Sequence, residues 1–134
     1  KLAFRKKYKI CPFWDTKSGD LEFKIDNIIK KLEVKAFISK GPSSFGPTEK
    51  WDIIFFVDAS DFNNKNFTIY QLNLSNNHNI WKNIKVNKNE TFEIQCNQKR
   101  RPRISFINII KQLDNNIKKK YLKIIFKGHI NQLK

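Results

Sequence analysis

The clearest pattern in the chain is an alternation of apolar and charged positions between Asp20 and Ile38. Successive side chains on a β-strand point to opposite faces, so this stretch predicts two strands joined by a two-residue turn at Asp26-Asn27. Both turn residues tolerate the positive φ that such a hairpin requires. Leu21 then pairs with Leu32, and one face is apolar except for Lys30. Because a slip of one residue would exchange the two faces, the hydrophobic pattern fixes the register.

Beyond the hairpin, Trp51 to Ala59 is a short continuous apolar run, typical of a strand buried on both faces. The other expected elements are a loop over residues 39–48, turns over 60–66 and 75–79, a strand over 67–74, a weaker strand over 80–86 and an amphipathic helix over 104–113. Periodicity leaves residues 121–126 open between strand and helix. Together these elements predict an α/β or α+β fold: a mixed central sheet of four to five strands, starting with a β-hairpin and flanked by helices.

Length and charge narrow the class of protein. A chain of 134 residues fits one domain, which we expect to span residues 1–134. Its 27 Lys and Arg residues against 12 Asp and Glu give a formal charge of +15, which favours a polyanionic partner such as nucleic acid. Part of this charge reflects the abundance of Lys, Asn and Ile that an AT-rich gene imposes. No apolar run approaches the ~20 residues of a membrane helix, so a transmembrane protein is excluded.

Two further features of composition concern processing and compartment. Cys11 and Cys96 form neither a CxxC pair nor a disulfide framework, which favours a reducing compartment, and we expect the cytoplasm. The sequence has no methionine, even at its first position, which indicates a processed chain, a trimmed chain or a piece of a longer one.

The hairpin register brings three residues of candidate chemistry together. Asp20 and Glu33 face each other with Cβ atoms ~5 Å apart, and Lys35 lies one step further along the same face. Two carboxylates this close repel each other unless a cation lies between them, and Mg²⁺ is commonly held by one or two carboxylates. Lys35 is then placed to orient or deprotonate a water molecule, or to hold a phosphate oxygen. The alternative is a solvated strand face with a weak Glu22–Lys31 pair.

These residues resemble the motif of the PD-(D/E)xK nuclease superfamily: an Asp, a variable spacer and then Glu-x-Lys on adjacent strands. The continuation from Ser39 to Ala59 is similar in style to type II restriction endonucleases, although Gly19 stands where the family often has proline. The resemblance covers about residues 19–59. It implies a restriction-endonuclease-like fold, a Mg²⁺ cofactor held by Asp20 and Glu33 with the Val34 carbonyl as a third ligand, and Lys35 as the catalytic lysine.

Asp26 is the other acidic residue available for the first position of the motif. It falls at the turn tip, where its side chain cannot meet Glu33. The resemblance also implies a homodimer that cuts double-stranded DNA.

Two segments are candidates for DNA contact. The run Lys99-Arg100-Arg101-Pro102-Arg103 holds three of the four arginines, whose planar guanidinium groups suit phosphates and guanine edges. Lys40, Ser43 and Ser44, in the loop after Lys35, offer further contacts to the backbone or the bases. The alternatives are a solvated basic run and an ordinary connecting loop.

Other conspicuous residues carry less chemistry. Trp51 is expected in the core, whereas Trp14 and Trp81 lie outside the core pattern and are expected in surface or interface packing. His78 and His129 are isolated, so neither a nucleophilic triad nor a zinc site is indicated.

The sequence therefore predicts a Mg²⁺-dependent endonuclease that hydrolyses DNA phosphodiester bonds, a type II site-specific deoxyribonuclease. The alternatives are a non-catalytic basic module that binds RNA or DNA, and a protein-interaction domain with incidental charge.

Overall fold

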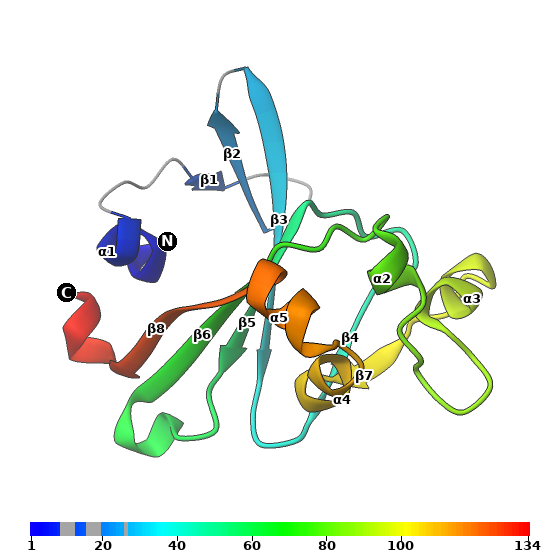
Figure 1. The fold of residues 1–134 in the computed structure, drawn as a ribbon. Helices are drawn as coiled ribbons and strands as arrows, with labels where there is room; N and C mark the ends of the chain where they lie inside the picture. The colour runs from blue at the N-terminus through cyan, green and yellow to red at the C-terminus, as the bar shows by residue number, and fades with distance from the viewer. Residues whose placement is uncertain (9–12, 16–19, 26) are drawn as a thin grey trace.

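The computed structural model describes residues 1–8, 13–15, 20–25 and 27–134, and its centre is a mixed β-sheet (Figure 1). Within these residues the sheet has six strands in the order β1-β2-β3-β5-β6-β8. The strands are β1 (Phe13–Asp15), β2 (Leu21–Ile25), β3 (Ile28–Phe37), β5 (Ile53–Asp58), β6 (Asn66–Leu72) and β8 (Leu122–His129). Only the β3–β5 pair is parallel. The expected α+β fold with a mixed sheet is confirmed, and β1 adds a short strand beside the hairpin.

Short helices and a second ladder complete the fold. The ladder pairs β4 (Pro42–Ser44) with β7 (Arg103–Ser105) in antiparallel fashion. The helices are α1 (Leu2–Tyr8), α2 (Asn79–Lys82), α3 (Phe92–Asn97), α4 (Phe106–Lys111) and α5 (Asn115–Tyr121), with 3₁₀ turns η1 (Phe62–Asn64) and η2 (Ile130–Leu133). None of the helices in the described ranges has the length and apolar character needed to cross a bilayer.

The β2–β3 hairpin has the predicted register, with Leu21 opposite Leu32 and Ile25 opposite Ile28. Asn27 adopts a φ of 65°, as a tight hairpin turn requires. The hairpin projects beyond the rest of the sheet in Figure 1. Further along, β3 leaves β2 and pairs with β5 from Leu32 to Phe37.

Both faces of the sheet are covered. The major core packs α4, α2, α3 and the loop before β5 against one face and includes Phe45, Trp51 and Trp81. The minor core lies on the other face and joins Ala3 of α1 to Leu32 and Phe55. The strand β5 supplies side chains to both, which confirms the prediction of a strand buried on both faces. The predicted core position of Trp51 is also confirmed, since only 2% of this residue is exposed.

The predicted strand over residues 80–86 is wrong. His78 caps the short helix α2, and its Nδ1 accepts a hydrogen bond from the Ile80 amide at 3.1 Å. The helix turns Trp81 inward, where it is 0% exposed and packs edge-on against Trp51. The expectation of surface packing for Trp81 is therefore also wrong. The side chain of Trp14 and the whole of Cys11, Gly19 and Asp26 lie outside the described residues.

The remaining boundaries differ in smaller ways. The predicted helix over 104–113 is shortened at its start because Ile104 belongs to β7 and the Ser105 Oγ caps α4 by accepting from the Asn108 amide at 3.2 Å. Residues 122–126, which periodicity left open, belong to the strand β8. The loop over 39–48 contains β4.

Candidate active site

The strand β3 places Glu33 and Lys35 on the same face of the sheet, just beyond the last residue paired with β2. Asp20 immediately precedes β2, and its Oδ2 accepts a hydrogen bond from the Val34 amide at 2.7 Å. The Asp20 carboxylate is therefore fixed to the backbone of β3 beside Glu33. The structure brings Asp20 and Glu33 close enough for the charge of Asp20 to raise the pKa of Glu33.

Lys35 is held between two carboxylates. Its Nζ lies 2.9 Å from Glu33 Oε1 and 3.0 Å from Glu49 Oε2, and it stands 5.0 Å from the centroid of the Phe45 ring. The side chains of Lys35 and Glu33 are only 14% and 11% exposed. Glu49 and Phe45 come from the loop between β3 and β5, so the ammonium group of Lys35 sits where a strand and a loop meet.

Burial and charge act on these ionisations in opposite directions. Burial raises the pKa of Glu33, and the carboxylates of Glu49 and Asp20 add to this, against the lowering effect of Lys35. Burial lowers the pKa of Lys35, but its hydrogen bonds to Glu33 and Glu49 more than offset this, so the pKa lies above its ordinary value. Lys35 is therefore held as an ammonium between the carboxylates of Glu33 and Glu49, while the Asp20 carboxylate lies near Glu33.

The closeness of the Asp20 and Glu33 carboxylates is the feature that suits a metal ion. Among the described residues no group of three or more His, Cys, Asp or Glu side chains is arranged to hold one. Asp20 and Glu33, with the backbone of Val34 between them, are hard oxygen donors of the kind that Mg²⁺ prefers.

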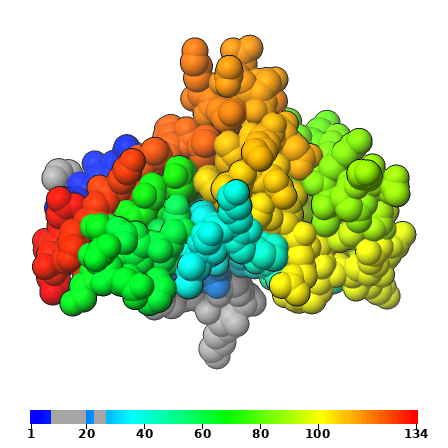
Figure 2. Space-filling model, turned by 90° about the horizontal axis from the view of Figure 1, so that it is seen from below, coloured from blue at the N-terminus to red at the C-terminus, as the bar shows by residue number. Residues whose placement is uncertain are grey.

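The β4–β7 ladder brings the basic run to the loop that follows Lys35. Ser44 pairs with Arg103, and the Arg101 Nε donates to the Ser44 Oγ at 3.3 Å. A methyl group at Gly46 would lie 3.3 Å from Arg101 Nη1 and 3.1 Å from Glu49 Oε1, so both head groups border this glycine. Figure 2 shows the loop after β3, in cyan, next to the basic segment, in yellow.

The other residues expected to contact DNA differ in their exposure and in their partners. Lys40 and Lys99 are exposed. Arg100 turns instead to Glu90, to which it is bound by two hydrogen bonds. Ser43 is buried, and its Oγ has no hydrogen-bond partner within the described ranges, so this side chain faces the interior.

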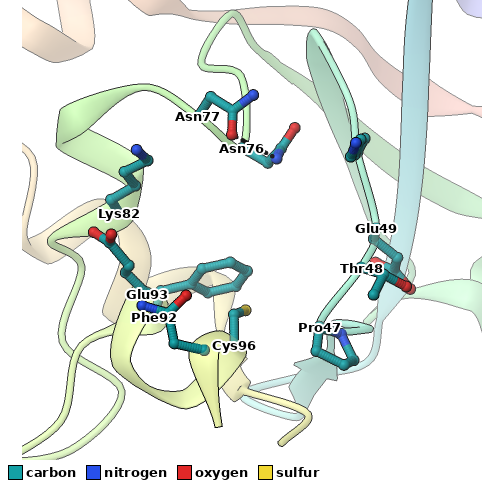
Figure 3. Close-up of a pocket in the computed structure, with 11 residues that line it drawn as sticks. Pro47, Thr48, Glu49, Asn76, Asn77, Lys82, Phe92, Glu93 and Cys96 are labelled. Atoms are coloured by element: carbon teal, nitrogen blue, oxygen red, sulfur yellow. Dashed lines mark hydrogen bonds between the residues drawn. The ribbon is translucent and has the colours of Figure 1, made fainter. Parts of the chain in front are cut away.

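Beside Glu49 the surface is hollowed into a cavity of about 280 Å³ (Figure 3). Thr48 and Glu49 line one wall, and Lys82 and Glu93 line the wall opposite. Burial raises the pKa of the Cys96 thiol in this cavity, and the nearby charge of Glu49 adds to the effect. Glu49 therefore faces Lys35 on one side and the cavity on the other.

Sequence reasoning did not find Glu49 or Phe45. Both lie in an irregular loop, where neither the two-residue nor the helical period assigns a direction to a side chain. The Gly-Pro pairs at 41–42 and 46–47 marked a loop but gave no indication of how it folds back.

The mixed sheet, with an acidic pair and a lysine at the end of its hairpin, is consistent with a nuclease of the restriction-endonuclease class. A comparison with protein-family models matches residues 11–114 to the model described as Bsp6I restriction endonuclease, and the chain belongs to this family. Searches of curated proteins and of solved structures found no match. Family membership makes the chain an endonuclease of restriction systems, with DNA as its partner. The matched stretch includes Asp20, Glu33, Lys35 and the basic run.

Proposed function

We propose that the chain is a Mg²⁺-dependent, type II site-specific deoxyribonuclease of the PD-(D/E)xK kind, with its active centre at Asp20, Glu33 and Lys35. The observation that carries this proposal is the grouping at the end of the hairpin, where Glu33 and Glu49 bind the Lys35 ammonium and Asp20 binds the Val34 amide. As type II enzymes do, it would act on double-stranded DNA as a homodimer in the cytoplasm.

Asp20 and Glu33 are the residues that would hold Mg²⁺, with the Val34 carbonyl as a third donor. Glu33 commits Oε1 to Lys35, and burial is the main cause that raises its pKa, with smaller contributions from the carboxylates of Glu49 and Asp20. When bound, Mg²⁺ polarises a phosphate oxygen and lowers the pKa of bound water.

Lys35 would act through its Nζ as a hydrogen-bond donor. Because its pKa lies above the ordinary value, the ammonium form is favoured, and this form donates to a phosphate oxygen or to the attacking water. Orientation of a water molecule or of the phosphate is thus better supported than removal of a proton from the water. Arg101, Arg103 and Lys40 would bind the DNA backbone beside it.

Cleavage of a mapped supercoiled plasmid tests the proposal. We expect discrete bands with Mg²⁺ and none with EDTA, and a loss of rate of at least about 100-fold in Asp20→Asn and in Lys35→Ala. Asp52→Asn is a matched control, because Asp52 Oδ2 also accepts a strand amide, that of Lys31 at 2.8 Å, without belonging to the site.

Salt-sensitive DNA binding without cleavage at any Mg²⁺ concentration would contradict the proposal and favour the non-catalytic module. If the wild type cleaves and both Asp20→Asn and Lys35→Ala cleave equally well, the assignment of these residues to the active centre is contradicted. A smear in place of bands would contradict site specificity.

A further inference from the structure

Glu49 is the partner of Lys35 that neither the motif nor the hairpin provides. It lies in the loop between β4 and β5, and its Oε2 accepts from Lys35 Nζ at 3.0 Å. Its side chain is 27% exposed, so the contact is only partly open to water. The Glu49 backbone is fixed as well, because its amide donates to the Gly46 carbonyl at 3.2 Å.

A lysine side chain needs such support to act at a defined point. Its stem has four rotatable carbons and ends in a compact charge, so its position is set by what surrounds the ammonium. Glu33, Glu49 and the Phe45 ring surround Lys35 Nζ from two different elements of the fold. The first of these three is also a proposed ligand of Mg²⁺.

The two carboxylates that bind Lys35 therefore differ in what else they must do. Negative charge that Glu33 shares with a metal ion is less available to Lys35. Glu49 comes from the loop and not from the hairpin, and its Oε2 is bound to Lys35 Nζ, whereas the Asp20 carboxylate is bound to the Val34 amide. Glu49 is then the acidic group that keeps the Lys35 ammonium in place.

We propose that Glu49 is a positioning residue of the reaction, which holds Lys35 Nζ beside Glu33 while Glu33 and Asp20 engage the metal. This inference rests on the proposed function. Glu49 acts through Lys35 and contacts neither the DNA nor the metal.

The neighbouring residues connect this contact to the basic run. Gly46 leaves room for Glu49 and Arg101 side by side, since a methyl group there would stand 3.0 Å from Glu49 Cγ and 3.3 Å from Arg101 Nη1. The loop that supplies Glu49 is thus held by the ladder that presents the arginines.

Two substitutions test the inference, with Glu93→Gln as the matched control on the opposite wall of the same cavity. Glu49→Gln keeps an oxygen that accepts from Lys35 but removes the charge, whereas Glu49→Ala removes both. Single-turnover cleavage of a labelled duplex carrying the mapped site should slow by about 10- to 100-fold in Glu49→Gln and by more in Glu49→Ala. Glu93→Gln should cleave at the wild-type rate.

Two readouts separate positioning from a structural role. With Ca²⁺ in place of Mg²⁺, the affinity of Glu49→Gln for the same duplex should equal that of the wild type, and its melting temperature should be unchanged. If affinity and melting temperature fall together with the rate, Glu49 supports the fold and the inference is overturned.

The result for the wild type distinguishes this inference from the proposed function. If the wild type cleaves, Lys35→Ala does not, and both Glu49 variants cleave at full rate, the inference is overturned and the function stands. If the wild type does not cleave with Mg²⁺, the proposed function fails and takes the inference with it.

Discussion

At the scale of single residues, folding strongly lowers the pKa of Glu90. Hydrogen bonds from Arg100, Asn87 and Gln95 lower its pKa from 4.5 to about 2. The folded chain therefore binds fewer protons at Glu90 than the unfolded chain does between these two values. The resulting stabilisation is fully present above pH 4.5 and is lost as the pH falls toward 2.

Glu90→Gln should remove this part of the acid sensitivity. We expect the free energy of unfolding of the wild type to fall more steeply than that of the variant between pH 4.5 and about 2. Urea denaturation at stepped pH measures the difference, which added salt should reduce because the Glu90–Arg100 pair is partly exposed to solvent. Glu93→Gln is the control. Parallel curves for Glu90→Gln and the wild type would contradict the prediction.

Some residues of the candidate site could be predicted from the sequence and others could not. Asp20, Glu33 and Lys35 lie in or beside regular strands, where alternation assigns each side chain to a face. Glu49 lies in a loop whose path depends on the β4–β7 ladder, a contact between segments far apart in the sequence. Ser43 was expected to contact DNA from that loop, and the same ladder turns it inward.

At the scale of elements, short helices depend on their caps. The helix α5 spans Asn115–Tyr121, and the Asp114 Oδ1 accepts a hydrogen bond from the Ile117 amide at 2.8 Å. A helix of this length is not stable on its own, so the cap and the contacts of Ile117 and Tyr121 with the major core hold it.

Asp114→Ala should lower the free energy of unfolding by about 1 kcal/mol, because it leaves the Ile117 amide without its acceptor. Asp114→Asn keeps an oxygen at the same position and should lower the free energy of unfolding by only a few tenths of a kcal/mol. Chemical denaturation at neutral pH compares the two. Equal losses in both variants would show that the charge of Asp114, rather than the cap, is what matters.

The period of the hydrophobic residues predicted some elements correctly and others wrongly. The hairpin alternates over two strands, and one register alone separates its apolar from its charged residues. Residues 80–86 are too short for such a decision, since Ile80, Ile84 and Val86 fit a strand while Ile80, Trp81 and Ile84 fit a helix. The His78 cap and the burial of Trp81 settle the choice in the folded chain.

At the scale of the whole molecule, the charge of +15 is spread over many elements, while two arginines, Arg101 and Arg103, lie near the site. Arg101 and Arg103 lie on or beside β7, next to the loop that follows Lys35. Lys127 lies on β8, the edge strand of the central sheet, whereas β7 belongs to the separate β4–β7 ladder. Nonspecific attraction and contact at the site therefore involve different residues.

Salt dependence distinguishes these two contributions. For duplex binding in Ca²⁺, Arg101→Ala and Arg103→Ala should each reduce the slope of log affinity against log salt by about 1, because each loses one phosphate contact. Lys127→Ala should leave the slope unchanged. Equal effects of all three substitutions would mean that the overall field, and not the basic run, holds the DNA.

The difference in length between β2 and β3 has a consequence for how such a site can be lost. Among the described residues the pairing of β2 with β3 ends at Leu21, and the Asp20 Oδ2 accepts a hydrogen bond from the Val34 amide. An insertion that continued the ladder past this point would offer the same amide a backbone carbonyl and release the Asp20 carboxylate. If Asp20 acts as proposed, cleavage would then be lost although every acidic and basic residue remained in the sequence.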